Sequence, residues 1–198
     1  MDTTHVQPGK GIGSLMLGMH RTEIEAELQK LHRTLGGQKE MRIGGDEPLW
    51  DDSDAGKGCY HVRYFAGDAI RDVGDISIFF MIGYDENGKA VSISIDRDAR
   101  PELCGFDVSQ TEAEPLVEAL KQYDTCVFDD PDEQLSTQYT FPTIGVRLWR
   151  EMAFHRKLLE DTAWVESMSQ VLEDEYEHLY FELVTVFLPE YAKIFGYV

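Results

Sequence analysis

Basic side chains are scarce in this chain. Lysine and arginine together number 18 against 37 aspartates and glutamates, which gives a formal net charge of −19 at pH 7. A field of this sign repels nucleic-acid phosphates and anionic lipid headgroups, so we expect neither nucleic acid nor a membrane surface as a partner. A basic protein would be attracted to it instead. The composition therefore favours a cationic protein partner.

Cysteine is also sparse. The chain has three cysteines, Cys59, Cys104 and Cys126, and no CxxC spacing. An odd number without that spacing is typical of reduced thiols rather than of a disulfide framework. Residues 1–5 have neither a basic start nor an apolar run, so we expect no secretory signal. No apolar stretch approaches the roughly 20 residues that a membrane span needs. We therefore expect a cytoplasmic protein.

Recognisable catalytic motifs are missing. The six histidines form no HExxH or HxH pattern, and no GxSxG occurs. Lys10 is followed by Gly11 rather than by the Ser or Thr of a phosphate-binding loop. Carboxylates are too numerous for one pair to be singled out as acid and base. We therefore expect a chain without enzymatic activity and without a cofactor.

One alternative is a metal-binding or hydrolytic enzyme that uses carboxylates and His178. Asp174 and His178 are four residues apart and would share one face of a helix. Two side chains do not complete a metal site, and Glu-rich helices produce this spacing by chance. We therefore expect no bound metal and keep Asp174 and His178 as weak candidate ligands.

Alternating apolar residues are the clearest pattern that the sequence does contain. Large apolar side chains occupy every second position over 76–84, and the alternation resumes over 91–95 after Asn87-Gly88. An Asn-Gly pair supplies the positive φ that a hairpin loop needs. Residues 76–96 are therefore predicted to form a β-hairpin. Similar patterns predict strands over 12–17, 60–65 and 179–188 and a second hairpin over 138–150, with a long loop over 38–58.

Helical spacing marks two acidic segments. Ile24, Leu28, Leu31 and Leu35 lie on one helical face, and Gly36-Gly37 ends the helix. The second helix is predicted to open with a capping box at 111–114 and to bury one face over 116–123. Residues 153–176 are predicted to form two short helices.

The two main helices match each other at an offset of 92 positions, for example Ile24 with Leu116 and Leu28 with Leu120. This offset is close to half of the chain. We therefore predict a single α+β domain over 1–198, with an antiparallel sheet and helices packed mainly on one face. Two tandem βα-ββ pseudo-repeats, at 9–98 and 99–198, would build it.

The first helix is preceded by a glycine-rich string. Gly11-Ile12-Gly13-x-Leu15-x-Leu17-Gly18-Met19 runs straight into it, although His20 stands where a Ser or Thr N-cap would be expected. Over about residues 9–30 the chain resembles bacterial polymorphic-toxin immunity proteins with a β-lactamase-inhibitor-like strand–helix–sheet fold. The resemblance implies a protein that binds another protein rather than turning over a substrate.

Acidic loops are the predicted contact surfaces. Residues 101–135 contain ten carboxylates and one lysine, which is either a solvated face or a docking surface for a cationic partner. A tryptophan among acids is a second candidate, because tryptophan is enriched at binding hot spots. The predicted partner-binding residues are Trp50, Asp51, Asp52, Asp54, Asp129, Asp130, Asp132 and Glu133.

A different contact surface is the sheet face that carries Phe79 and Met81. We expect a helix to cover it, because large apolar patches are rarely left exposed. Left uncovered, this face could bind a partner or join copies of the chain in an oligomeric structural module. The leading hypothesis from the sequence is nevertheless a non-enzymatic acidic protein-binding module, in its specific form an immunity protein that inhibits a cognate basic toxin.

Overall fold

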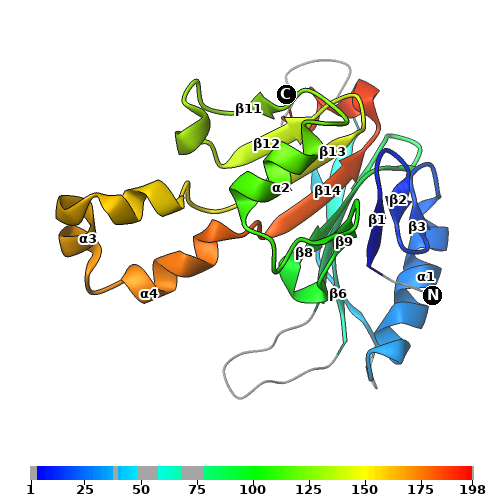
Figure 1. The fold of residues 1–198 in the computed structure, drawn as a ribbon. Helices are drawn as coiled ribbons and strands as arrows, with labels where there is room; N and C mark the ends of the chain where they lie inside the picture. Colours follow the sequence, from blue (N-terminus) through cyan, green and yellow to red (C-terminus); the bar gives the residue numbers. More distant parts are fainter. Residues whose placement is uncertain (1–3, 38–39, 49–57, 68–77, 198) are drawn as a thin grey trace.

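A long antiparallel sheet forms the centre of the molecule (Figure 1), in a computed structural model that describes residues 4–37, 40–48, 58–67 and 78–197. Its strands follow the order β11-β12-β13-β14-β8-β7-β6-β4, and β5 also pairs with β6. The strands of this sheet are β4 Arg42–Ile43, β5 Glu47–Pro48, β6 Tyr60–Ala66, β7 Ile78–Tyr84, β8 Ala90–Asp96, β11 Val127–Phe128, β12 Gln138–Phe141, β13 Val146–Trp149 and β14 Leu183–Phe187.

The β7–β8 hairpin confirms the strongest prediction from the sequence. Ile82 lies opposite Ile93 in the antiparallel register, and both side chains are fully buried. Gly88 has a φ of 71°, and Asp85 Oδ1 accepts hydrogen bonds from the backbone N–H groups of Asn87 and Lys89. The turn is thus built by a positive-φ glycine and an aspartate that closes the loop over itself. Strand β6 and the β12–β13 hairpin also lie where they were predicted.

Helix α1, Arg21–Thr34, confirms the first predicted helix. Ile24 and Leu28 are fully buried, whereas Leu35 lies just beyond the helix and is 38% exposed. Its N-terminus is closed by the Glu23 side chain, which accepts a hydrogen bond from the backbone N–H of His20 at 2.8 Å. A capping residue three positions into the helix therefore compensates for the histidine at the N-cap.

Helix α2, Ala113–Leu120, begins later than predicted. The predicted capping box is wrong, because the Thr111 hydroxyl donates to the carbonyl oxygen of Asp107 and does not cap the helix. Leu116 and Leu120 are fully buried as expected. Tyr123, which was predicted to continue that buried face, follows the end of the helix and is 61% exposed.

A second, small sheet lies beside the helices. Its strand order is β10-β9-β1-β2-β3, and the strands are β1 His5–Gln7, β2 Gly11–Ile12, β3 Leu15–Met16, β9 Glu102–Leu103 and β10 Phe106–Asp107. The single strand predicted over 12–17 is wrong, because Gly13, with a φ of 57°, turns the chain between β2 and β3.

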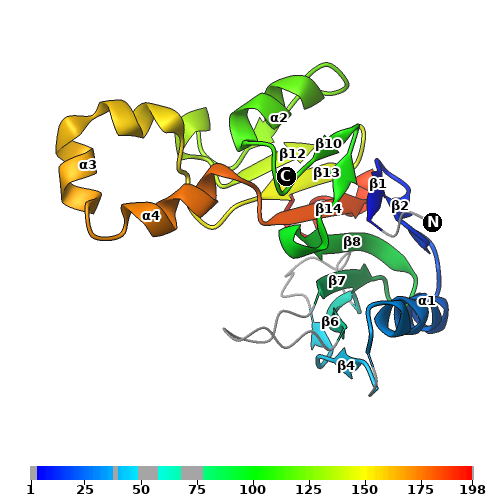
Figure 2. The same ribbon diagram turned by 60° about the horizontal axis from the view of Figure 1, so that its bottom comes forward.

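Both main helices pack on one face of the long sheet. Their buried side chains share one apolar core with alternate residues of strands β6, β7, β8, β12, β13 and β14 and with the small sheet. Helices α1 and α2 sit over different parts of the sheet (Figures 1 and 2). The fold is therefore α+β, with an antiparallel sheet and helices mainly on one face, as predicted.

The order of elements runs twice along the chain. A short hairpin, a helix and three strands of the long sheet follow one another as β2–β3, α1 and β6–β8, and again as β9–β10, α2 and β12–β14. The last strands of the two series, β8 and β14, pair with each other at the centre of the sheet. The series differ most at one connection, where a turn over 85–89 joins β7 to β8 but residues 150–182 join β13 to β14.

Residues 150–182 form a projection that we call the arm. It contains α3 Thr162–Met168 and α4 Leu172–Glu175, flanked by 3-10 turns, so the two predicted short helices are confirmed. The arm extends away from the sheet (Figures 1 and 2). Phe154 is buried at the base of the arm, and its ring centroid lies 5.6 Å from that of Trp164 and 6.0 Å from that of Tyr176.

The C-terminal segment 188–197 lies on the other face of the sheet. The Phe195 ring packs against His61 of β6, with 4.7 Å between ring centroids. The carbonyl oxygen of Tyr197 accepts a hydrogen bond from the Thr140 hydroxyl at 2.6 Å. This segment, with Phe187 of β14 and Val91, forms a second and smaller apolar cluster.

The structure changes two expectations from the sequence, one about the sheet face that carries Met81 and one about the loop over 38–58. Met81 points away from its neighbours Phe80 and Ile82, which face the helices, so the predicted helical cover over Met81 is wrong. Met81 is half-buried, and the side chain of Phe79 lies outside the described residues. The predicted long loop is wrong in part, because β4 and β5 interrupt it by pairing with β6.

Candidate functional site

A cleft with a volume of about 520 Å³ opens between α2, the turn before β12 and the base of the arm. Its rim carries five carboxylates, which are Glu112, Glu114, Glu118, Asp132 and Glu133. Pro115, Val117 and the ring of Tyr139 give it an apolar lining, and His155, Arg156 and Lys157 border it on the arm side. We call this site the acidic cleft.

Four of the five carboxylates have cationic partners among the described residues, and Glu118 and Glu133 share one of these cations. The Arg156 guanidinium donates to both oxygens of Glu112, and this hydrogen bond holds the pKa of Glu112 below its usual range. Lys121 Nζ lies 2.7 Å from Glu118 and 2.9 Å from Glu133. The single lysine within 101–135 therefore bridges α2 to the following acidic turn.

Glu114 and Asp132 are the remaining carboxylates of the cleft. Glu114 Oε1 lies 3.3 Å from Nη1 of Arg150, and its side chain is 46% exposed. Asp132 forms no ion pair with the described part of the chain, and its Oδ1 accepts a hydrogen bond from the backbone N–H of Gln134. Negative charge is therefore in excess at Asp132 and at Glu118 and Glu133, which share one lysine, whereas Glu114 has a cation of its own.

Arg150 lies beneath the cleft and is fully buried. Its Nη2 donates to the Tyr139 hydroxyl at 2.6 Å, and its Nη1 donates to the carbonyl oxygen of Phe154 at 2.5 Å and, more weakly, to that of His178 at 3.4 Å. Phe154 and His178 belong to the two ends of the arm. One guanidinium thus fastens both ends of the arm to the sheet and to α2.

His155 borders the cleft with only 8% of its surface exposed. Its Nδ1 has no hydrogen-bond partner among the described residues. Burial lowers the pKa of His155, although the charge of Glu114 opposes that effect. The ring is therefore neutral at pH 7, and one of its nitrogens is a hydrogen-bond acceptor.

The structure places only some of the predicted partner-binding residues at the acidic cleft. Asp132 and Glu133 line the acidic cleft, whereas Asp129 and Asp130 do not. Asp130 Oδ1 accepts from the backbone N–H of Asp132 and so shapes the turn. The predicted contacts Trp50, Asp51, Asp52 and Asp54 lie outside the described residues.

Asp129 is held by hydrogen bonds within its own loop. Its Oδ1 accepts from the backbone N–H groups of Thr137 and Gln138, and its Oδ2 accepts from the Thr137 hydroxyl at 2.7 Å. Burial alone would raise the pKa of Asp129, but these hydrogen bonds outweigh it and hold the pKa below its usual range. Asp129 therefore fixes the start of β12.

Asp129→Asn is expected to lower the free energy of unfolding by about 1 kcal/mol at pH 7, because the amide cannot accept all three hydrogen bonds. A carboxylate whose pKa is lower in the folded than in the unfolded protein stabilises the fold at pH values above its unfolded-state pKa, about 3.9 for aspartate. This stabilisation is lost as the pH falls through the pKa of the folded state. The difference in the free energy of unfolding between variant and parent should therefore stay constant from pH 7 to 5 and disappear below pH 4. Urea titrations at pH 7, 5 and 3 measure it, and a difference that widens toward pH 3 would contradict the assignment.

Glu112, Glu114, Glu118 and His155 were not singled out from the sequence. The first three belong to the acidic segment 101–135, but nothing in that run distinguished them from their neighbours. His155 meets them only because the arm returns to the sheet at Phe154 and His178. No local pattern could have indicated that contact.

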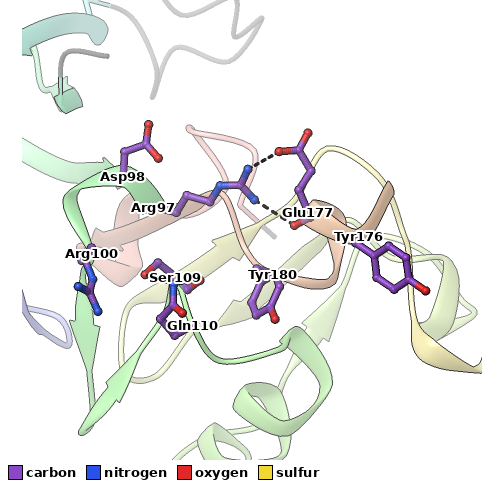
Figure 3. A pocket seen from close by; sticks show the side chains of 8 residues that line it. All are labelled: Arg97, Asp98, Arg100, Ser109, Gln110, Tyr176, Glu177 and Tyr180. Carbon is purple, nitrogen blue, oxygen red and sulfur yellow. Dashed lines mark hydrogen bonds and ion pairs between the residues drawn. The ribbon is translucent and has the colours of Figure 1, made fainter. Parts of the chain in front are cut away.

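A second hollow of about 600 Å³ lies between β8, β10 and the arm (Figure 3). Arg97 reaches across it to donate to the carbonyl oxygen and the carboxylate of Glu177. Arg100 donates to Asp107 at 2.7 Å. Because each guanidinium is paired with a carboxylate, this hollow offers little uncompensated positive charge to a ligand.

The weak metal candidates do not form a common site. Asp174 is exposed on α4, whereas His178 is buried with its Nδ1 3.2 Å from Glu182 Oε1. Within the described ranges, no group of three or more His, Cys, Asp or Glu side chains could hold a metal ion. None of the three cysteines is in a disulfide, and burial raises the pKa of the Cys126 thiol to about 12.

No family model, curated protein or solved structure matches the chain. The resemblance to immunity proteins therefore stays a prediction. Among the described helices, none combines the length and apolar character needed to cross a membrane.

Proposed function

We propose that this chain is a non-enzymatic acidic module that binds a basic protein partner. The observation that carries this proposal is the acidic cleft, in which α2 and the following turn bring five carboxylates around an apolar lining. Charged rims attract a partner and set its orientation, while apolar area at the centre supplies affinity. The formal net charge of −19 favours a cationic partner over an anionic one.

The immunity-protein resemblance suggests a specific form of this function. In that form the partner is a cognate basic toxin, and binding blocks its activity. The arm supports this form because it borders the cleft and enlarges the surface that a partner could meet (Figure 2). Asp130, Asp132 and Glu133 would contribute from the acidic turn on the opposite side.

The function is tested by pull-down of candidate basic toxins encoded near its gene, at about 150 mM salt. We expect one of them to form a stable complex whose affinity falls as salt is raised, because the contacts are largely ionic. A catalytically inactive toxin variant keeps the experiment independent of toxicity. Failure of every such candidate to bind, at low as well as at moderate salt, would remove the proposal.

A further inference from the structure

The acidic cleft has a set of acceptors that come from three different elements. Glu114 lies on α2, Asp132 precedes the turn η3 Glu133–Leu135, and His155 lies at the base of the arm. All three line the same cleft. Asp132 has no ion pair with a described residue, and Glu114 is paired only with the buried Arg150, at 3.3 Å.

The buried histidine supplies the second observation. Buried polar atoms in folded proteins nearly always have a hydrogen-bond partner. His155 is 8% exposed, yet its Nδ1 has none among the described residues. In the tautomer that carries its proton on Nε2, the neutral ring can accept a hydrogen bond at Nδ1 from a donor that enters the cleft.

The charges that face His155 have opposite signs. Glu114 and Asp132 lie close enough to raise its pKa, while Arg150 and Lys157 oppose them and burial has the largest effect. Arg150 donates to Tyr139, to the carbonyl oxygens of the arm and, at 3.3 Å, to Glu114. It therefore closes the bottom of the site rather than entering it.

We propose that the acidic cleft receives a single lysine or arginine side chain of the basic partner, with Glu114, Asp132 and His155 as its acceptors. This inference rests on the proposed function and specifies its chemistry. A lysine ammonium has three donors and an arginine guanidinium five, so either can satisfy acceptors of this kind. The aliphatic stem would lie against Pro115, Val117 and Tyr139, which line the cleft.

The test uses the isolated protein and single side-chain probes. N-acetyl-lysine methylamide and N-acetyl-arginine methylamide are titrated into ¹⁵N-labelled protein, with the norleucine and citrulline analogues as uncharged controls. We expect saturable shifts confined to the amides around Glu114, Asp132 and His155. The uncharged analogues should bind about tenfold more weakly, which corresponds to about 1.4 kcal/mol. Equal binding of charged and uncharged probes would overturn the inference.

A matched pair of double variants distinguishes a defined binding site in the cleft from attraction by the overall negative charge of the protein. E114Q/D132N removes two charges inside the cleft, and E47Q/E102Q removes two from exposed side chains outside its lining. Only the first should lose probe binding, and equal loss in both would overturn the inference. If E114Q/D132N does not fold, D132N alone decides, because asparagine retains the oxygen that accepts from the Gln134 N–H.

The outcomes also distinguish this inference from the proposed function. Probe binding in the cleft without any protein partner would leave the inference standing and the proposed function without support. A basic partner that binds E114Q/D132N as tightly as it binds the parent protein would support the proposed function and contradict the inference about the cleft. In that case the partner uses another part of the acidic surface, and the cleft is not its site.

Discussion

Arg150→Ala is expected to reduce the free energy of unfolding by about 3–5 kcal/mol, the range for removing one partner of a buried charged network. The fully buried guanidinium donates to the Tyr139 hydroxyl and to carbonyl oxygens of Phe154 and His178. Alanine leaves these buried acceptors without their donor and opens a large cavity beneath α2. Urea unfolding followed by circular dichroism measures the loss.

The loss should be accompanied by release of the arm, because Arg150 contacts both of its ends. Limited proteolysis should therefore cut residues 156–177 faster in Arg150→Ala than in the parent protein. Arg150→Met separates packing from hydrogen bonding, since it restores volume but no donor, and most of the loss should persist in it. Arg63→Ala is the matched control, because Arg63 is 47% exposed and its ion pair with Glu47 contributes only about 0–1 kcal/mol. An arm as protected in Arg150→Ala as in the parent would contradict this account.

Gly83→Ala is expected to lower the free energy of unfolding by about 1–3 kcal/mol, as overpacking of a core typically does. A Cβ at Gly83 would lie 2.3 Å from Ser92 Oγ and 2.5 Å from the Phe195 ring. These distances are too short for van der Waals contact. Both side chains must move, and one of them, Phe195, anchors the C-terminal segment to the sheet.

Two further variants test whether the contact with Phe195 causes the loss of stability in Gly83→Ala. Gly45→Ala should be nearly neutral, because no atom lies within 4 Å of a Cβ at that position. In the Phe195→Ala background, Gly83→Ala should cost less than in the parent, since the colliding ring is gone. Urea titrations of the four proteins give the coupling free energy. A Gly83→Ala cost that is unchanged by Phe195→Ala would show that the segment 188–197 is not what the new methyl group meets.

The parts of the fold that the sequence predicts are those with a local cause. The hairpin over 78–96 and the helical spacing at Ile24 and Leu28 are both confirmed, because side chains two, three or four positions apart report directly on strands and helices, whereas positions 76 and 77 of the predicted hairpin lie outside the described residues. The errors fall where the cause is not local. Glycine turned a predicted strand into β2 and β3, and β4 and β5 form only because β6 offers them an edge.

The candidate site was predicted only in part for the same reason. Asp132 and Glu133 were found because they stand in a conspicuous acidic run, and they do line the cleft. The burial of Arg150 could not be foreseen, since alternation places it beside Val146 and Leu148 but does not show that the arm folds back over it. The composition likewise does not reveal that Lys121 forms ion pairs with both Glu118 and Glu133 but none with Asp132.

The pairing of β8 with β14 at the centre of the sheet has a consequence for biosynthesis. Ile95 lies opposite Val184, so β8 leaves the ribosome long before its partner has been translated. Until then β8 is a newly made edge strand with free N–H and C=O groups, able to pair with another nascent chain. Because closing so distant a contact is slow, we expect refolding yield to fall with protein concentration, and chaperones to act mainly before β14 emerges.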